Sequence, residues 1–203
     1  MSAPHAHPGD LHLGFPERFD LALGTLIGLT AAAILGHWWA VPAWLGWGIL
    51  MGRISGVDFR ELRIPNELVA IGVVMTLPLL ALATIGHEST SRLSDASLIR
   101  AVAGAFAGLG IYLALNLVAG VVLRGGSIGL GMGDVKLAFV IGAYLAFVGW
   151  GPWFFGLFFL SFLCQAVIGL GLIATRKATL KTAIPFGPFM VLGAVLALLP
   201  AFS

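Results

Sequence analysis

Long apolar stretches recur along this chain from residue 21 to residue 202, and several approach the roughly 20 residues that cross the hydrocarbon core of a bilayer. Few charges lie between them: 10% of the 203 residues are charged, whereas a water-soluble domain carries roughly 25%. So few charges cannot cover a globular surface. The sequence therefore predicts an all-α, polytopic membrane helix bundle, with the lipid bilayer as its solvent.

The apolar stretches predict six to seven transmembrane helices. We expect seven, covering residues 21–35, 43–57, 64–85, 98–123, 135–148, 153–175 and 186–199. The first and fifth are short for full spans, and residues 21–57 could instead form one long span plus a re-entrant piece, which leaves six. Residues 21–203 are then the membrane-embedded domain, and residues 1–20 are a polar N-terminal tail.

The chain offers little to hold a metal or a cofactor. His5 and His7 in the tail are spaced to share a metal, but the tail supplies no other fixed ligands. Cys164 is the only cysteine, which excludes an internal disulfide and a multi-cysteine metal site. We expect neither a metal nor a cofactor.

Basic residues indicate the orientation of the bundle. Three groups lie on alternate connections and so on one side of the membrane: Arg53, Arg60 and Arg63; Arg124 and Lys136; Arg176, Lys177 and Lys181. Because Lys and Arg accumulate on cytoplasmic connections, we expect this side, and the tail with it, to be cytoplasmic. The net charge of +2 reflects such flanking residues, and we expect no nucleic-acid partner.

Two aspartates stand apart from the other acidic residues. Asp58 directly follows the second apolar stretch, and Asp134 opens the fifth. The expected topology places both at the cytoplasmic ends of their helices and at the same depth. An acid at the boundary of a span is costly to bury and usually has a function, although either aspartate taken singly could be a helix cap or a counter-ion to an arginine.

Two neighbouring carboxyl groups can carry out a specific chemistry. They do not both ionise easily, so the pair shares one proton near neutral pH. The ionised carboxylate can draw a proton from water, which attacks a peptide carbonyl, while the protonated partner polarises that carbonyl and later protonates the leaving amine. This is the requirement of an aspartic peptidase.

Glycines flank the second aspartate. Gly131 and Gly133 lack a Cβ, so the backbone there can bend or admit another chain closely. Lys136 lies on another side of the helix from Asp134, so we expect it to reach the lipid headgroups. For Arg60 and Arg63 the sequence leaves two alternatives: they reach the headgroups in the same way, or they recruit acidic or lipid groups.

Two proline motifs mark further helix starts. Pro65 suits the first turn of the third span, where Asn66 can bond exposed backbone groups. The motif Pro185-Phe186-Gly187-Pro188 opens the last span, and we expect it to leave exposed backbone that could pair with a substrate strand. Each motif is equally consistent with a helix start and nothing more.

Taken in order, these motifs resemble one family. The sequence runs from Asp58 through Ile64-Pro65-Asn66 and Gly131-Met132-Gly133-Asp134 to Ile184-Pro185-Phe186-Gly187-Pro188. It is similar to the peptidase domain of the type IV prepilin peptidases, intramembrane Gly-x-Gly-Asp aspartic endopeptidases, from about residue 45 to residue 198. The resemblance implies that Asp58 and Asp134 are catalytic.

The resemblance also implies substrates and a location. Members remove the short basic leader of prepilins and pseudopilins at the cytoplasmic face of a prokaryotic cell membrane. Long members carry an additional domain with paired Cys-x-x-Cys motifs that is associated with N-methylation. Cys164 alone cannot supply those motifs, so we expect a compact peptidase without methyltransferase activity.

One alternative function is a small proton-coupled transporter that uses intramembrane acids. It predicts internal repeats with acids in corresponding halves. The sequence has no convincing repeat, and its two distinctive acids fall at the membrane edge. The first apolar stretch lies outside the family resemblance, and the sequence assigns it no function.

Overall fold

A computed structural model describes residues 17–35, 40–84, 98–122, 130–179, 182 and 184–199. Its helices are α1 (Glu17–Leu35), α2 (Val41–Glu61), α3 (Asn66–Thr84), α4 (Leu98–Val122), α5 (Met132–Val148), α6 (Trp150–Phe154), the π-helical η2 (Phe155–Leu160), α7 (Ser161–Ala174) and α8 (Gly187–Ala197). This part of the chain contains no strand. The predicted all-α class is confirmed.

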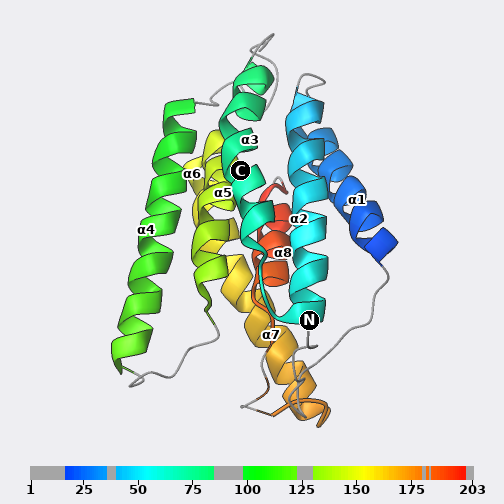
Figure 1. Ribbon diagram of the computed structural model, residues 1–203, viewed down its shortest axis with the longest axis vertical. Coiled ribbons are helices and arrows are strands. Elements are labelled where there is room, and N and C mark those ends of the chain that lie inside the picture. Colours follow the sequence, from blue (N-terminus) through cyan, green and yellow to red (C-terminus); the bar gives the residue numbers. More distant parts are fainter. Residues whose placement is uncertain are drawn as a thin grey trace.

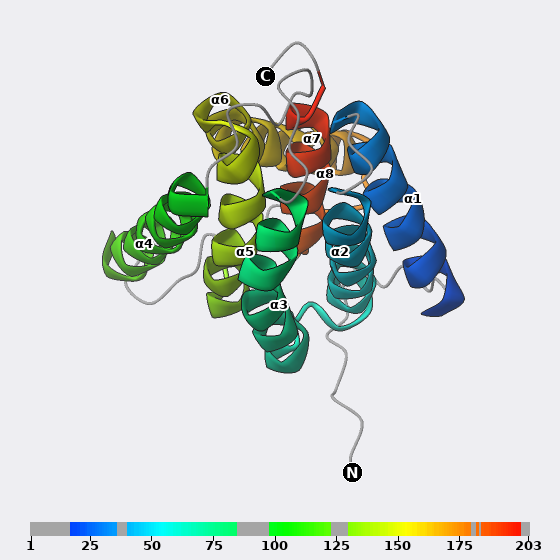
Figure 2. The same cartoon turned by 90° about the horizontal axis from the view of Figure 1, so that it is seen from above.

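The helices form one bundle around α5 (Figures 1 and 2). Helices α6, η2 and α7 follow one another without a break and form one continuous helical segment that passes behind α5 in Figure 1. Helices α2, α3 and α8 lie beside α5 on one side and α4 on the other, while α1 packs on the outside of α2. Residues 21–57 thus form two helices that lie side by side and not one long span.

Four helical segments are long and apolar enough to cross a membrane: Arg18–Leu35, Asn66–Thr84, Leu98–Val121 and Trp150–Ala174. The chain is therefore a membrane protein. Helix α2 is long enough but carries charges in its last turns, and α5 and α8 are shorter, with 17 and 11 residues. The count of six to seven spans stays a prediction.

Several predicted features fall outside the described residues. These are most of the tail, with His5 and His7, and the basic residues Arg124 and Lys181. The tail does not extend to residue 20 as predicted, because α1 already begins at Glu17.

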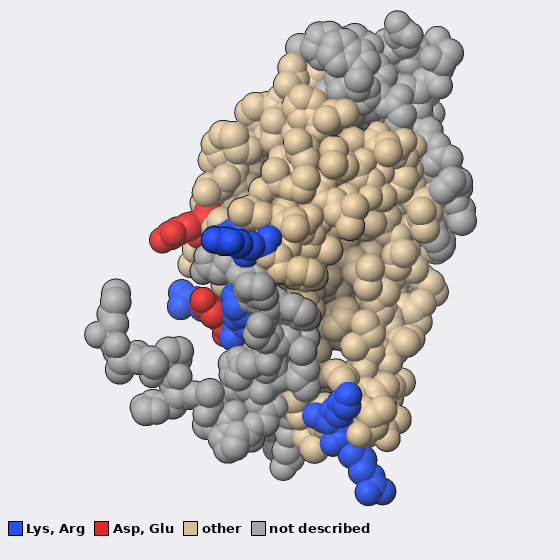
Figure 3. All heavy atoms as spheres, turned by 90° about the vertical axis from the view of Figure 1, so that its right-hand side faces the viewer, with Lys and Arg blue, Asp and Glu red and all other residues tan. Residues whose placement is uncertain are grey.

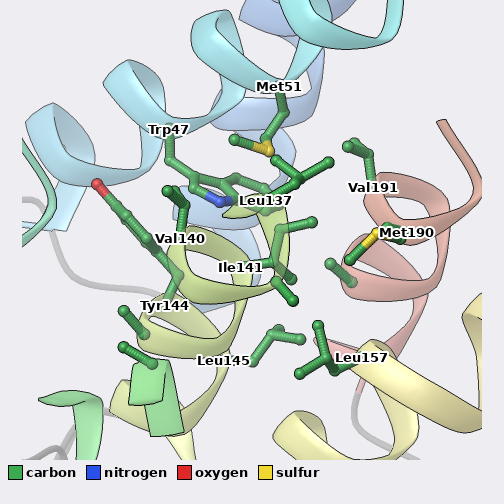
Figure 4. Packing of buried hydrophobic residues seen from close by; sticks show 14 of the residues in the cluster. Trp47, Met51, Leu137, Val140, Ile141, Tyr144, Leu145, Leu157, Met190 and Val191 are labelled. Carbon is green, nitrogen blue, oxygen red and sulfur yellow. The ribbon is translucent and has the colours of Figure 1, made fainter. Parts of the chain in front are cut away.

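Helix α5 is the centre of the core. Most of its residues are buried, as is typical of a helix that is apolar on all sides. Leu137, Ile141 and Leu145 point into a cluster completed by α2, α8 and η2, in which Met51 and Met190 are labelled in Figure 4. This packing surrounds the helix that carries Asp134, so the start of α5 is held from several directions.

Small residues let α1 approach α2 closely. A Cβ added to Gly24 would lie 2.6 Å from the carbonyl oxygen of Gly48, and one added to Gly28 would lie 2.6 Å from that of Trp44. Stripes of small residues allow membrane helices to pack backbone against backbone. The first apolar stretch, to which the sequence assigned no role, therefore packs along the helix that bears Asp58.

A buried ion pair closes the same interface. Asp20 of α1 is 1% exposed, and Arg60 of α2 donates to its two carboxylate oxygens over 3.0 and 2.6 Å. Arg53 lies 4.0 Å from one of these oxygens. Of the two alternatives for Arg60, the lipid headgroups or an acidic group, the structure shows the second: Asp20, which the sequence assigned to the tail, is part of α1 and binds it. The pair holds the last turn of α2, two residues beyond Asp58.

We expect Gly48→Ala to destabilise the protein, because the new Cβ would meet the backbone of α1 at Gly24 and Gly28. Overpacking of this kind costs about 1–3 kcal/mol. Gly110→Ala in α4 is the matched control: its Cβ meets nothing within 4 Å, and removing a helical glycine should be neutral or stabilise by up to about 1 kcal/mol. Thermal unfolding in detergent measures both, and equal stability of the two variants would contradict the packing argument.

Candidate active site

Asp58 lies in the last turn of α2 and is 4% exposed. The second predicted span ended at residue 57, but the helix continues to Glu61, with Arg60 bound to α1. Leu62 caps the C-terminal end of α2: it adopts a left-handed conformation (φ 51°) and donates its N–H to the carbonyl of Asp58. The chain therefore reverses one turn after Asp58 and enters α3 through Pro65.

Asp134 lies in the first turn of α5 and is 6% exposed. Gly131 precedes the helix in an extended conformation and donates its N–H to Asp134 Oδ2 over 2.7 Å. A carboxylate in the first turn is also favoured by the helix dipole. Gly133 lies against the connection from α2 to α3, where a Cβ would come within 2.7 Å of Ile64 Cβ. The close approach at Gly133 is thus made by Ile64 of this chain, and the predicted admission of another chain stays a prediction.

The start of α8 meets Asp58. Gly187 donates its backbone N–H to Asp58 Oδ2 over 3.1 Å, although the two residues are 129 positions apart in the chain. The four residues Pro185, Phe186, Gly187 and Pro188 are all buried. The N–H of Gly187 is therefore used by the aspartate and is not available to a substrate strand. The expected pairing of this motif with a substrate stays a prediction.

Both carboxyl groups open into one pocket of about 530 Å³. Its lining comes from all three motifs: Asp58, Leu62, Arg63, Ile64, Asn66, Leu130, Gly131, Met132, Gly133, Asp134, Lys136, Ile184, Pro185 and Phe186. Of the predicted site residues, Pro65, Gly187 and Pro188 are not in this lining. Ile64, Met132 and Ile184 line it as members of the motifs, although no role was predicted for them. Leu62 and Leu130 line it without having been predicted, and only their position next to the motifs could have indicated them.

Lys136 binds Asn66 at the edge of the pocket. Its Nζ donates to Asn66 Oδ1 over 2.9 Å, and both side chains are exposed. Lys136 does not pair with Asp134, as predicted from its place on the helix. The sequence predicted that Lys136 reaches the lipid headgroups and that Asn66 bonds exposed backbone groups. In the structure the two side chains instead bond to each other, between α3 and α5.

Neither aspartate of the pocket has a salt-bridge partner among the described residues. Both lie beyond the ends of the apolar segments 43–57 and 135–148 that are expected to span the bilayer. Burial raises the pKa of Asp58 and of Asp134 above the ordinary aspartate range, and the charge of Asp58 raises the pKa of Asp134 further. The described residues contain no group of three or more His, Cys, Asp or Glu placed to hold a metal.

The fold and the pocket define a membrane helix bundle that brings two buried aspartates from different helices together. The chain belongs to the type IV leader peptidase family, whose model matches residues 45–197. The family match begins within α2, so α1 lies before it. The resemblance seen in the sequence motifs is confirmed.

Similar proteins come from bacteria. The prepilin leader peptidase/N-methyltransferase of Stutzerimonas stutzeri is 34% identical over 186 residues, which are 89% of this chain and 56% of that protein. Its counterpart in Pseudomonas aeruginosa is 32% identical over 185 residues, with the same shares. The chain thus spans little more than half the length of these curated relatives. The leader peptidase HopD of Escherichia coli is 46% identical over 66 residues, 30% of this chain and 38% of HopD. No solved structure matches the chain.

Because Asp134 has no cation partner among the described residues, we expect Asp134→Asn to stabilise the protein at pH 8. Because the folded-state pKa is raised, the folded protein binds this proton more tightly than the unfolded chain, and stability falls as pH rises through that pKa. The neutral amide removes this effect, so we expect a gain of about 1–3 kcal/mol at pH 8 that shrinks toward pH 5.

Asp20→Asn is the control, since Asp20 is equally buried but has an arginine partner. Removing its charge should destabilise the protein by about 1–3 kcal/mol at pH 8. Thermal unfolding in detergent at the two pH values measures both variants. A loss of stability in Asp134→Asn that equals the loss in Asp20→Asn would contradict the assignment of an unpaired, proton-binding carboxyl.

Proposed function

We propose that this protein is a membrane peptidase that removes the leader peptide of type IV prepilins and related pseudopilins, with Asp58 and Asp134 as its catalytic pair. The observation that carries the proposal is that two buried aspartates, without cation partners in the described part of the chain, line one pocket. Membership of the type IV leader peptidase family supports the reaction, and the printed names of the relatives support the substrate class.

In this proposal the two carboxyl groups share one proton. Asp58 and Asp134 each accept one backbone N–H on Oδ2, from Gly187 and Gly131. These bonds orient the carboxyl groups and leave the second oxygen of each for water and substrate. The ionised carboxylate removes a proton from the attacking water, and the protonated one polarises the scissile carbonyl and then protonates the departing amine. No cofactor enters these steps.

The distribution of charge supports a pocket on the cytoplasmic side. On the face shown in Figure 3, charged side chains appear near mid-height at the left edge and at the lower right, and none appears among the described residues above them. Lys136 lies in the pocket itself, and Arg176 and Lys177 follow α7 at the same end. At the opposite end Arg100 binds carbonyl oxygens at the end of α5. An excess of basic residues at one end is typical of the cytoplasmic side.

No specific observation favours the alternative of a proton-coupled transporter. Such a protein holds its acids near the bilayer midplane, between helices that form a repeat. Asp58 and Asp134 instead lie in the last turn of one helix and the first turn of another.

Co-expression with a prepilin tests the proposed pair. We expect the wild-type protein to remove the leader, and Asp58→Asn and Asp134→Asn each to lower the rate by at least about 10²–10⁴-fold, because each amide loses one proton-transfer step. A gel shift of the prepilin measures processing, and immunoblotting of membranes checks that each variant is inserted. Processing at the wild-type rate by either inserted variant would refute its catalytic role.

A finer test uses the glycines that hold the carboxyl groups. In Gly187→Ala the added Cβ would lie 2.8 Å from Asp58 Oδ2, so the carboxyl must move and kcat should fall. In Gly131→Ala the nearest atom, Asp134 Oδ2, is 3.6 Å away, an ordinary contact. Both variants keep the backbone N–H. Kinetics of leader removal should show a clearly larger loss of kcat for Gly187→Ala, and a larger loss for Gly131→Ala would argue against this geometry.

A further inference from the structure

Helix α4 carries three side chains that can donate hydrogen bonds, and each donates to backbone carbonyl groups outside the helix. Arg100 binds carbonyls at the end of α5, and Tyr112 binds one in η2. Asn116 donates from its Nδ2 to the carbonyl oxygen of Leu130 over 2.7 Å. Leu130 lines the aspartate pocket, although no described residue of α4 does. Asn116 therefore reaches the edge of the site from a helix that lies outside it.

The antiparallel packing of α4 on α5 places Asn116 beside Leu130. Arg100 reaches carbonyls at the far end of α5, and a Cβ added to Gly108 would lie 2.8 Å from the carbonyl oxygen of Ala138. Asn116 lies eight residues beyond Gly108 in α4. Leu130 lies eight residues before Ala138, where the chain enters α5. The contact thus continues the register in which the two helices pack.

The carbonyl that Asn116 binds belongs to the same peptide group as the N–H that binds Asp134. A trans peptide group is planar, and its C=O and N–H point in opposite directions. The C=O end is that of Leu130, and it accepts from Asn116. The N–H end is that of Gly131, and it donates to Asp134 Oδ2 over 2.7 Å. Because the group is rigid, a bond that holds its oxygen also holds the direction of its N–H.

This peptide group needs a bond from outside the helix to keep its direction. Gly131 precedes the first turn of α5 in an extended conformation, and glycine restricts its own backbone torsions least. Its N–H lies before the hydrogen-bond ladder of the helix, so the ladder does not orient it. A hydrogen bond at the C=O end also polarises the peptide group and strengthens the bond that its N–H makes. Asn116 is placed to do both.

We propose that Asn116 is a positioning residue of the aspartate pair, which acts through the peptide group between Leu130 and Gly131 to direct the N–H that orients Asp134. The inference rests on the proposed function, because it concerns how that pair is held. Asn116 is half-buried in α4 and does not line the pocket, so its effect on the reaction passes through this peptide group. Loss of the amide should therefore slow the chemical step and leave substrate binding intact.

Kinetics of leader removal test the proposal with two variants. Asn116→Leu removes the amide donor, and we expect kcat to fall about tenfold or more while KM stays within about twofold. Tyr144→Phe is the control, because it also removes one side-chain bond to a backbone carbonyl, from α5 to Ala43 of α2, but far along α5 from Asp134. It should keep the wild-type kcat. A wild-type kcat in membrane-inserted Asn116→Leu, or equal losses of kcat in both variants, would overturn the inference.

A double-mutant cycle on stability gives a readout that needs no turnover. Asn116→Leu is made in the wild type and in an Asp134→Asn background, and thermal unfolding in detergent is measured at pH 8. The Gly131 N–H binds a carboxylate more strongly than a neutral amide, so Asn116→Leu should lower Tm clearly less in the Asp134→Asn background. Equal losses of Tm would show that Asn116 supports only the fold and would overturn the inference. If the wild type removes no leader, the proposed function fails, and the cycle alone decides whether Asn116 acts on Asp134.

Discussion

Two backbone hydrogen bonds orient the carboxyl groups of the pocket, and they depend on how the helices pack. Gly187 donates to Asp58 and Gly131 donates to Asp134. A buried carboxyl group without polar partners is strongly unfavourable, and one without a cation keeps its tendency to bind a proton. Backbone donors orient the group without contributing a full charge. The start of α8 must therefore reach the end of α2, and a glycine must stand there because a side chain would meet the carboxyl.

Asp20, the third buried aspartate, is stabilised by a cation and not by backbone N–H groups. Asp20 is bound by Arg60 on both oxygens, in an interface where glycines bring α1 and α2 together. A buried acid paired with arginine has a structural role, because the positive charge of the arginine balances its negative charge. The same turn of α2 thus carries an acid that can exchange a proton and a cation that anchors the turn to α1. The contrast explains why burial alone does not identify the proposed catalytic groups.

Two adjoining hollows of different chemistry lie at the aspartates. The pocket presents carboxyl, amide and amino groups, whereas the hollow between α3, α4 and α5 presents valine and phenylalanine side chains. The two hollows meet at the bond between Lys136 and Asn66. The polar groups of the site are therefore confined to the helix ends, and the adjoining wall along α3 and α4 is apolar.

Much of the fold and the central residues of the site could be predicted because they depend on local properties. Apolar length determines membrane helices, and the glycines and prolines near Asp58, Asp134 and Gly187 mark helix ends. The same reasoning ended α2 too early, at residue 57, because Arg60 and Glu61 look like a loop when hydropathy alone is counted. Their helix persists because Asp20, 40 residues earlier, binds Arg60.

The sequence by itself determined that this chain is a membrane helix bundle of the type IV leader peptidase family, with two distinctive aspartates. Only the tertiary structure decided that Gly187 binds Asp58, that Lys136 binds Asn66, and that an apolar groove opens beside the pocket. The physical reason is the same in each case. Hydropathy and helix-end signals act within one or two turns, whereas the two hydrogen bonds join residues 129 and 70 positions apart and the groove lies between three helices. These features exist only once the helices have packed.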